Sequence, residues 1–242
     1  GVPSFIHGYR HFCGVVDGYT GLGQVYACRA PTGPVAVSAL KQFLIWARVL
    51  LKSAGPVTPI IVRTDQGSAF MGGVFSEYVR SLQSQHSPSV AYAPQQNSLV
   101  ERMWGVVFNL ARILLHAANL SMVWHAFAVK LAAYLRVIHP KARTGISRLE
   151  SFSGTKPDLR YLHAFGCSVE AYLGKEQRYA ADKKRDLPLG KKLVDHAAAG
   201  IYLGPAYPTP GHLVYFLKKR IVAACVHVAF DESSFPGVAE TP

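Results

Sequence analysis

The order of the apolar runs along the chain is the feature that most constrains its fold. Up to residue 140, short β-prone runs alternate with long stretches whose apolar residues recur at the helical period. After residue 150 only short strand-like runs remain, separated by Gly, Pro and Lys. This change predicts an α/β domain over residues 1–140, a linker over 141–164 and a small all-β unit over 165–235.

The individual elements follow from local patterns. Two β-prone runs on either side of a Gly-containing turn predict a hairpin, His11–Val16 with Gly23–Cys28. Pro59 cannot donate to a sheet, so the run from Val57 to Val62 predicts a buried strand paired over Ile60–Val62. The other predicted elements of the first part are the helices Val35–Ser53, Phe75–Leu82, Pro94–Ala118 and Met122–Val137 and the strand Ser89–Ala93. Those of the second part are the strands Ser168–Leu173, Ala199–Leu203, Leu213–Leu217 and Ile221–Val228.

The charge of the chain indicates a polyanionic partner. Its 26 Lys and Arg against 14 Asp and Glu give a formal net charge of +12, and half of the residues are hydrophobic, which excludes wholesale disorder. Nucleic acid and an anionic membrane surface both fit, and charge that serves only solubility is the alternative. Basic residues concentrate between Lys175 and Lys192, which predicts an exposed loop. The most apolar stretches contain Lys or Arg, so no membrane span is expected.

The cysteines give little sign of a metal centre. Cys13, Cys28, Cys167 and Cys225 lie far apart and form no C-x-x-C pair, so a zinc site is not indicated. They are expected to be reduced and mostly buried thiols of an intracellular protein.

Two acidic residues stand out because the first 150 residues contain only five. Asp65 comes at the carboxyl end of the predicted strand, where open α/β sheets place their ligands. Glu101 comes early in a long predicted helix, on a narrow polar face with Gly105 and Asn109. A single Asp at the end of a strand is more often a helix cap or a turn residue. A single Glu on a helix is usually a solvated surface residue. The pair is more informative than either member.

The flanks of this pair resemble a known family. Asp65 and Glu101 are separated by 35 residues, within Arg63-Thr64-Asp65-Gln66-Gly67 and Pro94-Gln95-Gln96-Asn97-Ser98-Leu99-Val100-Glu101. This pattern resembles the last two acids of the Asp, Asp, Glu triad of retroviral and retrotransposon integrases of the copia type. Further similar segments are Val16-Asp17-Gly18-Tyr19-Thr20, Lys156-Pro157-Asp158-Leu159, Phe165-Gly166-Cys167, Gly200-Ile201-Tyr202-Leu203-Gly204 and Phe230-Asp231-Glu232, so the resemblance covers about residues 5 to 235.

The resemblance implies a fold and a function. The fold is α/β, an RNase H-like mixed sheet with flanking helices followed by a small SH3-like β-barrel. The function is DNA binding and DNA integration by metal-dependent strand transfer, with Asp65 and Glu101 as catalytic ligands of Mg²⁺ or Mn²⁺. The resemblance also implies that DNA is the partner and that the full-length protein is a homo-oligomer. It implies that the protein acts in the nucleus, which it reaches through the cytoplasm. Nucleic-acid contacts are expected at Asn97 and Tyr92 by resemblance, and at Arg102, Lys183, Lys184 and Arg185 by charge.

The chain departs from the family pattern at its start. The family's first acid lies just before a Gly-Pro pair, whereas this chain opens on Gly1-Val2-Pro3, which indicates a fragment truncated at its amino terminus. Asp17 ends the strand antiparallel to the missing one, so it is predicted to form a turn instead. Smaller departures are Ala69, where Glu is frequent, and Ser98, where Gly is usual. Two alternatives therefore stay open: a non-catalytic nucleic-acid-binding relic or domesticated module of the same fold, and an unrelated basic α/β protein.

Overall fold

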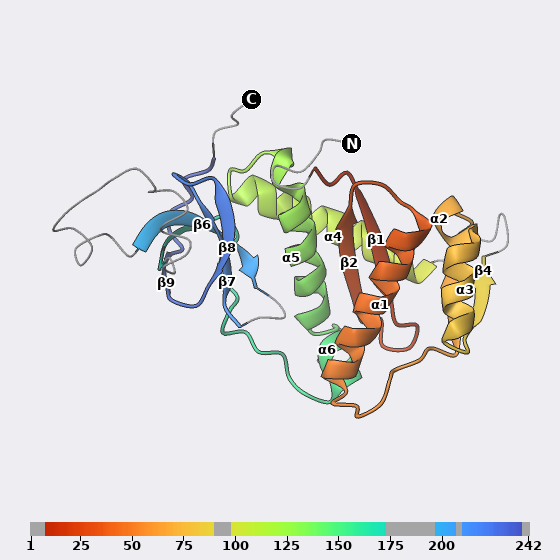
Figure 1. The fold of residues 1–242 in the computed structure, drawn as a ribbon. Coiled ribbons are helices and arrows are strands. Elements are labelled where there is room, and N and C mark those ends of the chain that lie inside the picture. Colours follow the sequence, from red (N-terminus) through yellow and green to blue (C-terminus); the bar gives the residue numbers. More distant parts are fainter. Residues whose placement is uncertain (1–7, 90–97, 173–196, 207–209, 239–242) are drawn as a thin grey trace, which may run out of the picture. The chain divides into compact units, whose positions relative to one another are not determined.

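The computed structural model describes residues 8–89, 98–172, 197–206 and 210–238 (Figure 1). The chain divides into two compact units. The first contains residues 1–111 and 132–157, and the second contains residues 112–131 and 158–242. The domain boundaries expected at residues 140 and 165 stay a prediction.

The predicted hairpin is confirmed. Strands β1 (His11–Val16) and β2 (Gly23–Cys28) pair antiparallel along their full length, from His11 opposite Cys28 to Val16 opposite Gly23. Asp17 makes the turn, as predicted, because its Oδ2 accepts hydrogen bonds from the backbone N–H and the hydroxyl of Thr20, at 2.7 and 2.6 Å. Gly21 supplies the left-handed conformation that the turn requires, with φ of +75°.

Helix α1 (Gly33–Leu50) packs against the hairpin, as its apolar period predicts. Pro34 lies in its first turn, where the missing N–H costs nothing. The side chains that it buries include Ala36, Leu40, Phe43, Trp46 and Ala47. Phe43 and Trp46 form a core with Leu22 and Val137, and Val15 of β1 packs against this core.

The second pair of strands corrects the prediction at two places. Strand β3 covers Ile61–Thr64, so it continues past Val62, and it pairs in parallel with β4 (Gln85–Pro88), a strand that the sequence did not indicate. Apart from Ser89, the strand predicted over Ser89–Ala93 lies outside the described residues. Strand β4 is polar, so no apolar run marks its position in the sequence. Helices α2 (Ser68–Met71), which the sequence did not indicate, and α3 (Gly73–Ser81) connect the two strands.

Helix α4 (Ser98–Ala117) packs closely on β1 (Figure 1). Successive strand residues point to opposite faces, so Phe12 and Gly14 share a face that Val15 does not. Phe12 contacts the stacked rings of Trp104 and Phe108 on α4, with centroids 6.3 Å away in both cases. A Cβ on Gly14 would lie 2.6 Å from Met103 Cε and 2.7 Å from Trp104 Cζ2. The absence of a side chain at residue 14 lets α4 approach the sheet.

We expect Gly14→Ala to destabilise the protein by about 1–3 kcal/mol, because the added methyl group overpacks the contact with Trp104. Gly105→Ala is the matched control: nothing lies within 4 Å of its Cβ, and the change should stabilise the helix by about 0.8–1 kcal/mol. Urea denaturation measures both. A Gly14→Ala protein as stable as the unsubstituted chain would contradict the close packing of α4 on β1.

Helices α5 and α6 complete the helical part of the chain. A short 3₁₀ turn, Met122–Trp124, precedes α5 (His125–Ile138), where a single helix was predicted. Helix α6 (Arg148–Ser153) lies in the segment predicted as a linker. In the first unit, the buried Arg136 donates from Nη1 to the carbonyl of Gly21 at 3.0 Å, which ties α5 to the hairpin turn.

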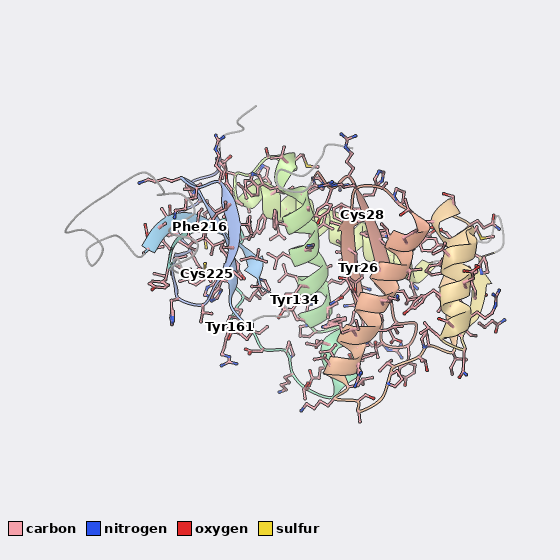
Figure 2. The ribbon with its side chains drawn as sticks, in the orientation of Figure 1. Tyr26, Cys28, Tyr134, Tyr161, Phe216 and Cys225 are labelled. Carbon is pink, nitrogen blue, oxygen red and sulfur yellow. The ribbon has the colours of Figure 1, made fainter. Side chains whose placement is uncertain are left out.

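The second unit contains a five-stranded antiparallel sheet in the order β8-β7-β6-β5-β9. Its strands are β5 (Ser168–Tyr172), β6 (Ala197–Pro205), β7 (His212–Phe216), β8 (Ile221–Cys225) and β9 (Val228–Asp231). The predicted strand Ile221–Val228 is thus two strands. The hydrophobic core of the second unit includes Tyr202, Phe216 and Cys225, and the last two are labelled in Figure 2.

This sheet curls toward a barrel. Strands β8 and β9 lie at opposite edges of it, yet only Val226 and His227 separate them in the sequence. The Cα atoms of Cys225 and Val228 are three residues apart in the sequence and can be separated by at most about 11 Å. The outer strands of a flat five-stranded sheet would be about 19 Å apart. The edges must therefore approach each other, as the expected small β-barrel requires.

Two further expectations concern cysteines and membranes. All four cysteines are free thiols, and all but Cys13 are buried, as predicted. Of the helices in the described ranges, none combines the length and apolarity needed to cross a bilayer.

Candidate metal and nucleic-acid site

Asp65 lies directly after β3, at the carboxyl end of the strand, as predicted from the sequence. Its side chain is exposed, and Oδ1 accepts a hydrogen bond from the backbone N–H of Gly67 at 2.8 Å. A Cβ on Gly67 would lie 2.8 Å from the same oxygen, so a larger residue there would shift the Asp65 carboxylate. The turn fixes one carboxylate oxygen, and Oδ2 accepts no hydrogen bond from the described residues.

A hydrogen-bonded chain holds the strand end that carries Asp65. The buried Thr64 bonds through Oγ1 to His86 Nε2 at 3.0 Å, and His86 Nδ1 bonds to the hydroxyl of Ser76 at 3.1 Å. Burial lowers the pKa of His86, which favours the neutral ring that these two contacts suit. Strands β3 and β4 and helix α3 are thereby tied together just before Asp65.

Glu101 lies in the first turn of α4 and is exposed. A carboxylate is favourable there because the helix dipole is positive at its amino terminus. Met103 and Val107 are buried, whereas Gly105 and Asn109 are exposed with Glu101, so the predicted polar face is confirmed. The packing of α4 on Gly14 fixes the position of this helix relative to β1.

Both acids are placed relative to neighbouring residues of β1. Burial raises the pKa of the Cys13 thiol to about 11, and the negative charges of Cys28 and Asp65 add to the effect. The Asp65 carboxylate thus interacts electrostatically with Cys13 of β1, while Glu101 belongs to the helix that packs on Gly14. That the two carboxylates share one metal ion stays a prediction. Within the described ranges, no group of three or more His, Cys, Asp or Glu side chains is arranged to hold a metal.

The other predicted site residues separate into two groups. Arg102 follows Glu101 on α4 and is exposed. Asn97, Tyr92, Lys183, Lys184 and Arg185 lie outside the described residues. Their contacts with nucleic acid remain predictions.

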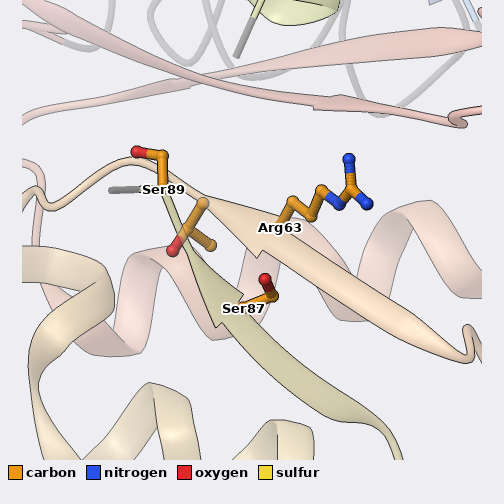
Figure 3. A pocket seen from close by; sticks show the side chains of 4 residues that line it. Arg63, Ser87 and Ser89 are labelled. Atoms are coloured by element: carbon orange, nitrogen blue, oxygen red, sulfur yellow. The ribbon is translucent and has the colours of Figure 1, made fainter. Parts of the chain in front are cut away.

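Sequence reasoning missed a pocket beside Asp65. It is lined by Arg63, Thr64, Ser87 and Ser89 (Figure 3). Arg63 and Ser87 face each other across the parallel pair of β3 and β4. Their pairing depends on a register between segments 24 residues apart, and the sequence did not indicate β4 itself. The local signal was Arg63 in the flank of Asp65.

Comparison with the sequences of known proteins shows which proteins this chain is related to. No protein-family model matches it. It is 31% identical over 181 residues to the retrovirus-related Pol polyprotein from transposon TNT 1-94 of Nicotiana tabacum, which covers 74% of this chain. Over 232 residues, which are 94% of this chain, it is 25% identical to the retrovirus-related Pol polyprotein from transposon RE1 of Arabidopsis thaliana. The chain is related to the copia-type Pol polyproteins. It spans 13% and 14% of the length of these two relatives.

The fold of this copia-type chain matches that of a solved structure. A chain of the simian T-cell lymphotropic virus intasome matches it over 93% of its length, with a TM-score of 0.50 and 17% identity, and this chain covers 75% of that one. The catalytic core domain of HTLV-2 integrase, solved with magnesium in a trimeric form, matches 61% of the chain and 87% of that domain, with a TM-score of 0.45 and 25% identity. The intasome match shows that the copia-type chain has a mixed α/β integrase core fold followed by a five-stranded antiparallel sheet.

Proposed function

We propose that this chain binds DNA and supplies two of the three metal ligands of an integrase that joins DNA strands. The observation that carries the proposal is the placement of Asp65 and Glu101. Each is an exposed carboxylate, one directly after β3 and the other in the first turn of α4, at the 35-residue spacing of the copia-type integrases.

The donor set fits a hard divalent cation. Mg²⁺ prefers carboxylate and water oxygens, and both acids present such oxygens to solvent. The Gly67 N–H orients the Asp65 carboxylate through Oδ1, which leaves Oδ2 for a ligand. Glu101 would be the second ligand, carried by a rigid helix. When bound, a pair of such ions activates the attacking oxygen and stabilises the leaving one in phosphoryl transfer. Asp65 and Glu101 would hold the ions, and the basic surface would hold the DNA.

The partners proposed follow from charge and relationship. The net charge of +12 supports binding to the phosphate backbone of element ends and target DNA. We further propose that the full-length protein is a homo-oligomer and that it acts in the nucleus, where its DNA target lies.

A third carboxylate is needed because two divalent ions bring a formal charge of +4 into a small site. Asp17 is engaged with Thr20 in the hairpin turn, so we propose that residues preceding this chain in the natural polypeptide supply it.

The test is strand transfer from a labelled DNA end with Mg²⁺. This chain alone should give no product, and a polypeptide extended upstream to include an Asp-bearing strand should give product. Equal activity in both, abolished by Asp17→Asn, would show that the ligands are misassigned. An extended polypeptide that binds DNA without forming product would favour the second candidate, a non-catalytic nucleic-acid-binding relic or domesticated module.

A further inference from the structure

The pocket beside Asp65 has the composition of an anion site. It has a volume of about 130 Å³ and is lined by Arg63, Thr64, Ser87 and Ser89 (Figure 3). Arg63, Ser87 and Ser89 bring one guanidinium and two hydroxyl groups, whereas the Thr64 hydroxyl is bonded to His86. Among the described residues, no acidic side chain lines it. The pocket can therefore donate many hydrogen bonds and carries a positive charge.

The strands fix two of these side chains on one face. Arg63 and Ser87 are register partners in the parallel pair, so their side chains emerge next to each other. Val62 and Thr64 belong to the opposite set: Val62 packs against the core of α1 and α3, and Thr64 bonds to His86. Arg63 is exposed, which leaves its guanidinium accessible from solvent.

The donors of the pocket are available. Within the described part of the chain, the side chains of Arg63, Ser87 and Ser89 have no hydrogen-bond or ion-pair partner. Asp158 and Arg160 show the contrasting case, because at the same separation of two residues they form an ion pair at 2.7 Å. Asp65 and Arg63 form no such ion pair among the described residues, and the hydrogen bond of Asp65 goes to the backbone N–H of Gly67 instead.

We propose that this pocket binds one phosphate group of a DNA backbone and so seats the strand next to Asp65. The proposal rests on the proposed function, and it assigns Arg63 and Ser87 a role in holding the substrate. A guanidinium matches the oxygens of a phosphate with two parallel hydrogen bonds, and the Ser87 hydroxyl adds a third. The volume is close to the about 150 Å³ of a cavity that accommodates benzene, which suits a phosphate group rather than a whole nucleotide. Arg63 is two residues from Asp65, so a phosphate held there lies beside the proposed metal ligand.

The experiment measures the affinity of this chain for a short fluorescently labelled DNA duplex over a range of salt concentrations. We expect Arg63→Gln to weaken binding about tenfold at low salt and to reduce the slope of log K against log salt by about one. Arg63→Lys should keep the slope and lose about threefold in affinity, because lysine cannot make the paired contact. Ser87→Ala should lose about threefold with no change of slope.

Arg80→Gln is the matched control, since Arg80 is an exposed arginine of the same unit, on α3 and outside the pocket. It removes the same charge and should change affinity less than about twofold and leave the slope unchanged. Equal slopes for Arg63→Gln and Arg80→Gln, with Ser87→Ala unchanged, would overturn the phosphate site while leaving DNA binding intact. Loss of salt-dependent DNA binding in the unsubstituted chain would overturn both the site and the proposed function. Because Ser87→Ala keeps the charge and removes one hydroxyl, it tests the site even if the Arg63 variants fold poorly.

Discussion

Asp65→Asn and Glu101→Gln are each expected to lower strand transfer at least about a thousandfold in a polypeptide that carries this chain together with its preceding strand. Each change removes one charged metal ligand, which is worth several kcal/mol of transition-state stabilisation, and about 4 kcal/mol corresponds to a thousandfold in rate. The fold should be retained because both side chains are exposed, and the free energy of unfolding should change by less than about 1 kcal/mol, the most that loss of the Glu101 charge at the helix amino terminus costs. Asn at residue 65 can still accept the hydrogen bond from the Gly67 N–H.

The matched control for these two variants is Glu77→Gln, which removes an exposed carboxylate from α3. It should leave strand transfer within about twofold of the unsubstituted rate, since surface substitutions of this kind have small effects. The measurement is the rate of product formation from a labelled DNA end. Full activity in either Asp65→Asn or Glu101→Gln would contradict the assignment of that residue as a metal ligand.

The affinity of this chain for duplex DNA is expected to fall steeply with salt. A protein that makes six to ten phosphate contacts loses about 10³ to 10⁵ in affinity between 50 and 200 mM salt, because each contact releases counterions. The net charge of +12 supports contacts of this number. Neutralising Lys183, Lys184 or Arg185 should lower the slope of log K against log salt by about one for each side chain that contacts a phosphate.

Lys156→Gln is the control for these basic residues, since Lys156 is an exposed lysine outside the predicted basic loop. For Lys156→Gln, the slope of log K against log salt should equal that of the unsubstituted chain. Fluorescence anisotropy of a labelled duplex gives all of these values. An affinity that does not change with ionic strength would contradict the proposed binding to the phosphate backbone.

Local patterns predicted much of the first unit. The hairpin and helix α1 were expected from period and turn chemistry, and both form close to the predicted residues. Strand β4 was missed because its sequence, Gln85 to Pro88, is polar and its pairing with β3 decides its position. The break between β8 and β9 was also missed, since the run from Ile221 to Val228 is uniformly strand-forming and only the curl of the sheet separates the two strands.

Those parts of the candidate site that depend on local sequence were predictable. The position of Asp65 after a strand and that of Glu101 on an exposed helical face depend on nearby residues, so sequence patterns indicated both. The glycine that lets α4 approach β1 depends on a contact between Gly14 and Trp104, which are 90 residues apart. The pairing of Arg63 with Ser87 likewise depends on strand register. Contacts of this kind follow from the tertiary fold alone.

Titration of this chain with Mn²⁺, followed by the electron paramagnetic resonance signal of the free ion, tests most directly whether Asp65 and Glu101 share one metal ion. We expect Asp65→Asn and Glu101→Gln each to weaken binding at least about tenfold, and the double variant to bind no more weakly than the weaker single variant, because two ligands of one ion act as a unit. Glu77→Gln should bind like the unsubstituted chain. Unchanged Mn²⁺ affinity in either variant, or losses that add in the double variant as for two independent sites, would contradict a shared metal ion.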